Sequence, residues 1–185
     1  MLPLHTHFIG IPVPESLCDI VKESREWMTY VYGCKSGYGT PPHITLVPPF
    51  ALDKQNTQKD VELATSKALE KAIGLFPLEV NISGFGAFSE RTVFAAVKDS
   101  PSWQKLHEIF ISTFASDFAG QVKKSKRLFC PHLTIANRDI PSGTMDEILK
   151  HFATMQVQET FEARSVCIYV RTKSGSWTCG QEIGV

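Results

Sequence analysis

Apolar residues recur at helical spacing in four segments of the chain, where they fall on one side of a 3.6-residue repeat. The segments are residues 14–32 and the stretches that begin after Asn56, after Ser100-Pro101 and after Thr144. Asparagine is a common helix cap, so we expect Asn56 to cap the second helix. Thr144 and Glu147 have the spacing of a capping box at the start of the fourth helix.

Extended segments alternate with these helices and are bounded by glycine, proline and other turn residues. The expected strands lie at 4–13, 42–48, 78–88, 92–98, 131–136, 160–172 and 176–185. This order of elements predicts an α+β fold with antiparallel sheets, each flanked by helices. No Pro/Gly/Ser-rich linker interrupts the chain, so we expect residues 1–185 to form a single domain.

Two of the expected strands carry nearly the same motif. The stretch "PHITLVPPF" contains His43 and Thr45, and "PHLTIANRD" contains His132 and Thr134, 89 residues further along. Side chains alternate between the two faces of a strand, so the His and Thr of each motif point the same way, about 7 Å apart. The apolar residues between and after them point into a core. The repetition suggests that the chain consists of two similar halves.

Such a pair of motifs can perform acid–base chemistry on a phosphate. A lone histidine in an apolar strand is usually packed or on the surface, but two motifs related by an approximate twofold would face one cleft. Imidazole, with a pKa near 6.5, can act as a base or an acid at neutral pH. One of His43 and His132 would accept a proton from the attacking hydroxyl or water, and the other would donate one to the leaving oxygen. Thr45 and Thr134 would hold the phosphate oxygens, and no metal is required.

Composition narrows the class of protein. The formal net charge is zero, which argues against binding a long nucleic acid, although a nucleotide or a short RNA end could still bind in a local pocket. The five cysteines form no C-x-x-C pair, the N-terminus has no leader-like segment, and no stretch of 18 apolar residues occurs. We therefore expect a reduced, soluble, cytoplasmic protein and no contact with a membrane. Cys130 precedes His132 by two residues, and a small unreactive thiol is favoured over a nucleophile there.

At the two motifs the sequence resembles the 2H phosphoesterase superfamily, and within it the 2′-5′ RNA ligase-like branch. The hairpin "ISGFGAFSERTVFAAV" followed by a helix adds to the resemblance. The resemblance implies a bilobal fold with two pseudo-symmetric antiparallel sheets and a central cleft. It also implies catalytic roles for His43 and His132, phosphate binding by Thr45 and Thr134, and no metal or cofactor. Relatives often carry an Arg soon after the second motif, whereas here Asn137 intervenes before Arg138.

Further residues are candidates for substrate binding. Lys126 and Arg127 belong to the basic stretch "KKSKR" next to the second motif, which could attract a phosphate or form a solvated loop. Tyr38 and Tyr169 could stack on a base, although ordinary packing is the alternative for both. His5 and His7 share a strand face, but without a third ligand we expect no metal there. Phe85, Phe88 and Phe94 are expected in the core.

These observations favour a phosphodiesterase that opens 2′,3′-cyclic phosphates, or cleaves 2′-5′ linkages, of nucleotides or RNA. The substrate would be a small nucleotide or an RNA terminus, and we expect the protein to be a monomer. Two alternatives remain open. The first is 2′-5′ RNA ligation, which uses the same groups in reverse. The second is a module that binds a phosphate or RNA end without turnover, which arginine or lysine would serve better than two histidines.

Overall fold

The structure is a computed structural model that describes residues 5–125 and 127–185. The helices are α1 (Glu15–Tyr32), α2 (Gln58–Ala72), α3 (Pro101–Asp117) and α4 (Met145–Ala153), with a short 3₁₀ turn at Ile73–Leu75. The strands are β1 (His7–Pro12), β2 (His43–Phe50), β3 (Leu78–Phe88), β4 (Thr92–Val97), β5 (His132–Asn137), β6 (Gln158–Ala163), β7 (Ser165–Arg171) and β8 (Trp177–Gly184). The predicted α+β class and antiparallel pairing are confirmed.

One expected strand is in fact two. The segment 160–172 breaks at Arg164 into β6, which pairs with β3, and β7, which pairs with β1. The two strands therefore lie in different halves of the sheet. The break could not be predicted from alternation alone, because both strands continue an alternating pattern.

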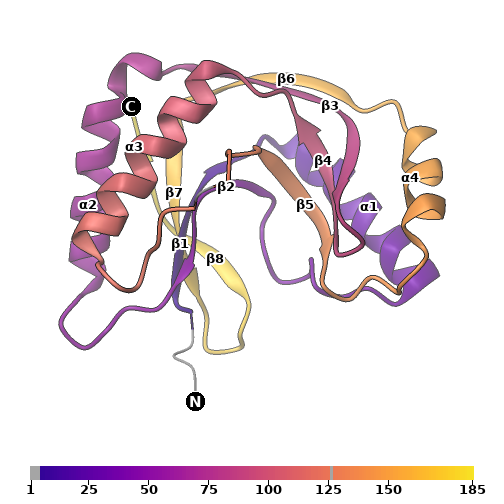
Figure 1. The fold of residues 1–185 in the computed structure, drawn as a ribbon, viewed down its shortest axis with the longest axis horizontal. Coiled ribbons are helices and arrows are strands. Elements are labelled where there is room, and N and C mark those ends of the chain that lie inside the picture. The colour runs from indigo at the N-terminus through magenta and orange to yellow at the C-terminus, as the bar shows by residue number, and fades with distance from the viewer. Residues whose placement is uncertain (1–4, 126) are drawn as a thin grey trace.

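The strands form one eight-stranded sheet in the order β6-β3-β4-β5-β2-β1-β7-β8. Its two halves join between β5 and β2, where Ile44 and Leu133 are the paired residues. We call β2, β1, β7 and β8 with α2 and α3 the β2 lobe, and β5, β4, β3 and β6 with α1 and α4 the β5 lobe (Figure 1). Helix α1 follows β1 in sequence but packs on β5, and α3 follows β4 but packs on β2. Each lobe thus contains one helix that follows, in the sequence, a strand of the other lobe.

The larger of two hydrophobic clusters among the described residues extends through both lobes. It includes Ile9 and Phe50 from the β2 lobe and Val93 and Phe152 from the β5 lobe, all essentially inaccessible to solvent. The apolar residues of both motifs, among them Ile44 and Leu133, belong to it, so the inward faces of the motif strands are fixed by burial. This burial holds the opposite, polar faces of both strands in place.

Two predicted helix caps differ from the observed ones. Thr57 rather than Asn56 caps α2, and its N–H and hydroxyl donate to the Asp60 carboxylate at 2.7 and 2.8 Å. The expected capping box at α4 does not form, because the Thr144 hydroxyl donates to the Pro141 carbonyl. The Glu147 carboxylate instead accepts a hydrogen bond from the Tyr32 hydroxyl.

We expect Thr57→Ala to lower the thermal unfolding midpoint by about 2–4 °C, the effect of losing one helix cap in a chain of this size. Differential scanning fluorimetry or calorimetry measures the shift. Gln55→Ala is the matched control, because Gln55 is exposed and lies just before the helix. Equal midpoints for the two variants would show that Thr57 does not stabilise α2.

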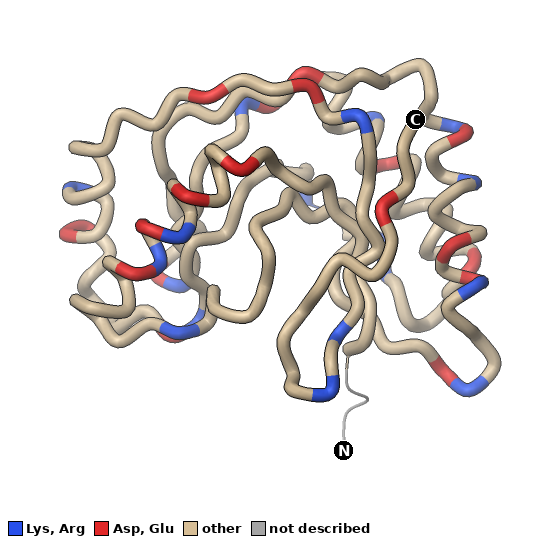
Figure 2. The backbone as a smooth tube through the Cα atoms, turned by 180° about the vertical axis from the view of Figure 1, so that it is seen from behind, with Lys and Arg blue, Asp and Glu red and all other residues tan. Residues whose placement is uncertain are grey.

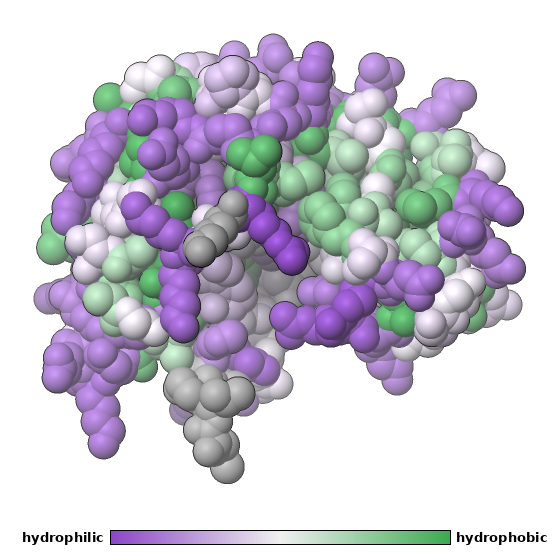
Figure 3. All heavy atoms as spheres, in the orientation of Figure 1, coloured by the Kyte–Doolittle hydropathy of each residue, from purple (hydrophilic) through white to green (hydrophobic). Residues whose placement is uncertain are grey.

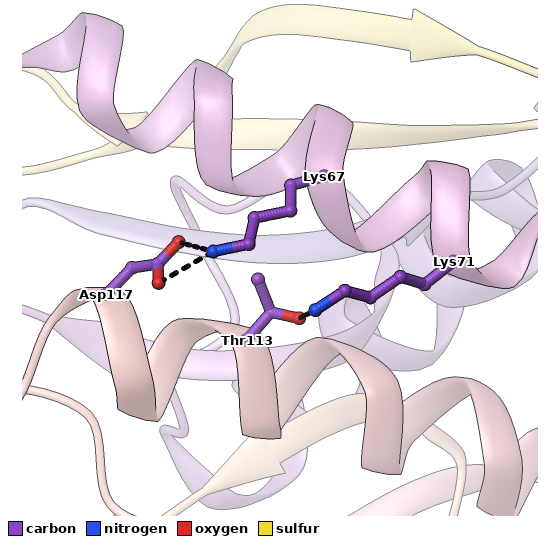
Figure 4. A network of polar contacts seen from close by, with 4 residues as sticks. All are labelled: Lys67, Lys71, Thr113 and Asp117. Atoms are coloured by element: carbon purple, nitrogen blue, oxygen red, sulfur yellow. Dashed lines mark hydrogen bonds and ion pairs between the residues drawn. The ribbon is translucent and has the colours of Figure 1, made fainter.

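Helices α2 and α3 lie side by side and are joined by polar contacts (Figure 4). Lys67 pairs with Asp117 at 3.1 Å, and the Lys71 ammonium donates to the Thr113 hydroxyl at 3.4 Å. Figure 2 shows acidic and basic residues interspersed along both lobes, without a large region of one sign. That distribution suits a small ligand better than a long polyanion.

The prediction of a fully reduced protein is wrong for two of the cysteines. Cys167 and Cys179 form a disulfide between β7 and β8, while Cys18, Cys34 and Cys130 are free. Within the described ranges, none of the helices combines the length and the apolar character needed to span a bilayer.

Candidate active site

The two motif strands are neighbours at the centre of the sheet. Ile44 is paired with Leu133 in antiparallel register. Extending that register by one residue each way places His43 opposite Thr134, and Thr45 opposite His132. All four side chains share the face that the core does not use, and the two histidines occupy diagonal positions, which are typically about 7–8 Å apart and somewhat closer at Cβ. The two motifs therefore lie on adjacent strands, and their joint role as one site stays a prediction.

Both imidazoles are anchored in the same way. Nδ1 of His43 lies 2.7 Å from the Pro41 carbonyl oxygen, and Nδ1 of His132 lies 2.8 Å from the Cys130 carbonyl oxygen. A carbonyl only accepts, so each Nδ1 carries the proton and each Nε2 has a free lone pair in the neutral ring. Nε2 of His43 lies 3.1 Å from the Thr45 hydroxyl, which can donate to it. In each neutral ring, Nε2 is thus the nitrogen that can accept a proton.

Aromatic residues of the β2 lobe support His43. Its ring packs on Phe8 and Tyr169, with centroids 4.4 and 5.0 Å away, and Phe8 and Tyr169 stack on each other. Gly10 makes room for the ring, since a Cβ there would lie 3.1 Å from its Cδ2 and 2.9 Å from the Ile44 carbonyl oxygen. The imidazole is therefore held by packing on one side and by a hydrogen bond at its edge.

His132 has a comparable aromatic setting in the β5 lobe. Its ring is nearly perpendicular to that of Phe88 at a centroid distance of 4.9 Å, and Phe94 lies at 5.2 Å. Phe88 was expected in the core, but its side chain is 38% exposed because it lies at the end of β3, beside the cleft. It is available to a ligand bound next to His132.

Burial lowers the pKa of both histidines. For His43 the pKa falls to about 4, first through loss of solvation and then through the nearby positive charges of Arg25 and His132. Loss of solvation also lowers the pKa of His132 below its ordinary value, while the hydrogen bond to Cys130 opposes the shift. Both rings are thus neutral at pH 7 in the free protein, and His43 is the harder of the two to protonate.

Two cavities flank the motif residues and share Thr45. The first, of about 430 Å³, is mainly apolar and is lined by Thr45, Leu46, Pro48, Phe88, His107, Ser125, Arg127, Leu128, Phe129, Cys130 and His132. The second, of about 230 Å³, is more polar and is lined by Phe8, Arg25, Ser36, Gly37, Thr40, His43, Thr45, Pro49, Thr134, Asn137, Arg138 and Trp177. Figure 3 looks onto the hollow between the lobes, with apolar residues gathered on the β5 lobe beside it. The cleft therefore has an apolar end at His132 and a polar end at His43.

The residues that were expected to bind substrate differ in their location and exposure. Arg127 lines the apolar cavity beside His132, whereas Lys126 lies outside the described residues. Tyr38 is 49% exposed and lines neither cavity. Tyr169 is only 1% exposed and stacks on Phe8, in line with the packing alternative. Its ring also packs against the His43 imidazole.

Three further side chains concern the metal site and the cysteine nucleophile that the sequence analysis considered. Among residues 5–125 and 127–185, no cluster of three or more His, Cys, Asp or Glu side chains could hold a metal ion. His7 is hydrogen bonded to Gln58 and Thr6, and His5 is exposed. Burial, and then the charge of Asp99, raise the pKa of Cys130, so this exposed residue carries a thiol rather than a reactive thiolate.

Arg25 and Trp177 are among the residues of the polar cavity that sequence reasoning missed. Arg25 had a signal, since it lies four residues after Val21 and three before Met28, within the apolar stripe of α1. Arg138, which lines the same cavity, has a φ of 77°, a conformation that costs energy for a residue with a Cβ. Its N–H donates to the Arg91 carbonyl, which helps to hold this turn.

Comparison with known proteins identifies the family. The model of the 2′-5′ RNA ligase superfamily matches residues 13–175, which include both motifs. The chain belongs to this superfamily. The predicted resemblance is therefore confirmed.

Relatives of this 2′-5′ RNA ligase superfamily member agree in sequence and fold. A protein of Geobacillus sp. (strain WCH70) named "Putative phosphoesterase" is 27% identical over 140 residues, which cover 75% of each chain. The crystal structure of TT0787 from Thermus thermophilus matches with a TM-score of 0.64 at 16% identity, covering 97% of both chains. E. coli LigT in complex with 3′-AMP matches with a TM-score of 0.61 at 15% identity, covering 98% of both chains. The two structures share the bilobal fold described above.

Proposed function

We propose that the protein is a metal-independent phosphodiesterase that opens 2′,3′-cyclic phosphates, or cleaves 2′-5′ linkages, of nucleotides or RNA termini. The observation that carries the proposal is that His43 and His132 lie on adjacent strands, each with Nδ1 hydrogen bonded to a backbone carbonyl oxygen, which leaves Nε2 as the proton-accepting atom of the neutral ring. The superfamily match and the nucleotide bound to LigT support a nucleotide substrate. We also propose that residues 1–185 form one two-lobed domain. Monomeric state and cytoplasmic location stay predictions.

The chemistry follows from the two Nε2 atoms, one of which accepts a proton while the other donates one. Nε2 of His43, the more weakly basic ring, accepts a proton from water as the water oxygen attacks phosphorus. The bond from phosphorus to the ribose O3′ breaks, and protonated His132 donates its Nε2 proton to that oxygen. The product is a 2′-phosphate, and Thr45 and Thr134 donate hydrogen bonds to the non-bridging oxygens. His43 gains one proton and His132 loses one, so proton exchange with water must restore neutral His43 and protonated His132 before the next turnover.

The cleft also suggests how the substrate is oriented. Phe88, Leu128 and Phe129 give the His132 end an apolar surface for a base, and Leu128 is 90% exposed. The polar end, with Arg25 and Arg138, suits the ribose phosphate or the rest of an RNA chain. The leaving oxygen would then lie on the His132 side.

The direct test incubates the purified protein with adenosine 2′,3′-cyclic phosphate in the presence of EDTA. We expect turnover to a 2′-phosphate, identified by ³¹P NMR, and no hydrolysis of adenosine 3′,5′-cyclic phosphate as the control. Binding without turnover would support the non-catalytic module. Loss of activity on adding EDTA, with recovery on adding Mg²⁺ or Mn²⁺, would contradict the metal-free mechanism.

The superfamily description favours ligation as a second candidate. In ligation the 5′-hydroxyl of another RNA replaces water as the nucleophile, and the same bond to O3′ breaks. Adding a 5′-hydroxyl oligonucleotide to the assay distinguishes the two outcomes, because ligation yields a longer 2′-5′-linked product at the expense of the monophosphate.

A further inference from the structure

One arginine connects the two motif segments directly. Arg25 lies on α1, and its Nη1 donates to the Thr40 carbonyl at 2.8 Å while Nη2 donates to the Thr134 carbonyl at 3.0 Å. Thr40 precedes His43 by three residues, and Thr134 is the threonine of the second motif. One guanidinium is therefore hydrogen bonded to both the loop before His43 and the strand that carries His132.

This connection matters because the strands themselves are weakly joined. Ile44 and Leu133 are the paired residues between β2 and β5. The loop at 33–42 is also attached to the end of β5, since the N–H groups of Lys35 and Ser36 donate to the Asp139 carboxylate at 2.6 and 2.8 Å. Asp139 holds the outer part of this loop, and Arg25 holds the part nearest His43.

The packing around Arg25 leaves little freedom for its side chain. A Cβ on Gly37 would lie 2.7 Å from Arg25 Nε and 2.5 Å from the Ile135 carbonyl oxygen, so only glycine lets the loop approach both groups. The guanidinium is thus enclosed between the loop, α1 and β5. Its two hydrogen bonds set how far apart the loop and β5 lie.

Arg25 carries a charge that lacks an anionic partner. Its Nε is buried without a hydrogen bond, and none of the described carboxylates forms an ion pair with it. Burial lowers its pKa to about 10, so the guanidinium stays protonated at neutral pH. A half-buried cation without a counterion costs free energy, and this one lines the cavity that contains His43 and Thr134. A phosphate bound there would supply the missing negative charge.

We propose that Arg25 is a positioning residue, which fixes the spacing of the two histidine motifs and provides positive charge for the phosphate bound between them. The role of the phosphate rests on the proposed function; the positioning of the motifs does not. The titratable and charged groups around His43 are Arg25 from α1, His132 from β5, Arg138 after β5 and Tyr169 from β7. Of these, the charges of Arg25 and His132 disfavour protonation of His43.

The test compares Arg25→Met, which loses the charge, with Arg25→Lys, which keeps the charge but loses the two-pronged hydrogen bonding. Arg164→Met is the matched control, because Arg164 is exposed, pairs with Glu162 and lines neither cavity. Two quantities are measured: the titration midpoint of the His43 ring by NMR, and the kcat and KM for the cyclic nucleotide.

Arg25→Met should raise the His43 midpoint by about 0.5–1 pH unit, because a nearby positive charge is removed. Arg25→Lys should leave the midpoint near its wild-type value. Both variants should lower kcat by about 10–100-fold, the effect of misplacing groups by a fraction of an ångström to one ångström. Arg25→Met should also raise KM, because the charge facing the phosphate is lost.

A wild-type His43 midpoint in Arg25→Met, together with kinetics like those of Arg164→Met, would overturn the proposal. If Arg25→Met does not fold, Arg25→Lys decides: an unchanged kcat overturns the proposal, and a lowered kcat with an unchanged midpoint supports it. If the wild type binds but does not turn over cyclic nucleotides, the proposed function fails. The midpoint shift and weaker phosphate binding in Arg25→Met would still support the role of Arg25.

Discussion

Replacing either His43 or His132 by alanine is expected to lower the turnover of a 2′,3′-cyclic nucleotide by about 10²–10⁴-fold, the usual contribution of one general acid or base. Each variant removes one of the two Nε2 atoms that handle protons on opposite sides of the phosphorus. KM should change little, because Thr45, Thr134 and the arginines of the cleft remain. The double variant should be only slightly slower than either single variant, because the two rings act as a unit.

The control for these variants is His151→Ala. His151 also stacks on an aromatic ring, Trp27, at a centroid distance of 3.6 Å, but it lies on α4 and lines neither cavity. Its replacement should leave turnover unchanged. Since His43 packs on Phe8 and Tyr169, His43→Gln, which keeps most of the volume, separates lost chemistry from lost packing. A histidine whose replacement leaves full turnover does not belong to the catalytic pair.

The parts of the structure that could be predicted from the sequence depend on local periodicity. Apolar spacing located all four helices, and alternation assigned His43 and Thr45 to one face and Ile44 to the core. The repeat of the motif then predicted that two distant segments meet. Periodicity reports which side of an element is buried, and burial is enough to orient the motif side chains.

What could not be predicted depends on contacts between distant segments. Nothing local in the alternating stretch around Arg164 shows that β6 and β7 pair with different strands. Tyr169 alternates like an exposed or half-buried residue, yet Phe8 and His43 enclose it. The position of Arg25 within the apolar stripe of α1 suggests burial, but its partners, the loop before His43 and the strand of Thr134, are distant in the sequence and could not be predicted.

Activity is expected to depend steeply on pH, with kcat/KM greatest on the acidic side of neutrality. The free enzyme must hold a neutral base and a protonated acid. The pKa of His43 is lowered to about 4, and that of His132 is lowered from 6.5. The active form, with His43 neutral and His132 protonated, is therefore most populated above the pKa of His43 and below the lowered pKa of His132. Above the pKa of His132, kcat/KM should fall about tenfold per pH unit as the acid loses its proton.

The measurement is a pH series of kcat and kcat/KM at constant ionic strength, together with the unfolding midpoint at each pH. A bound phosphate is anionic and favours the protonated rings, so the kcat profile should lie at higher pH than the kcat/KM profile. The acidic and alkaline limbs of the profile are properties of the coupled pair of histidines. The two single variants show which limb depends on which ring. His132→Ala should remove the alkaline limb and His43→Ala the acidic one. A kcat/KM that keeps rising to pH 8 or above would contradict acid catalysis by a histidine with a lowered pKa.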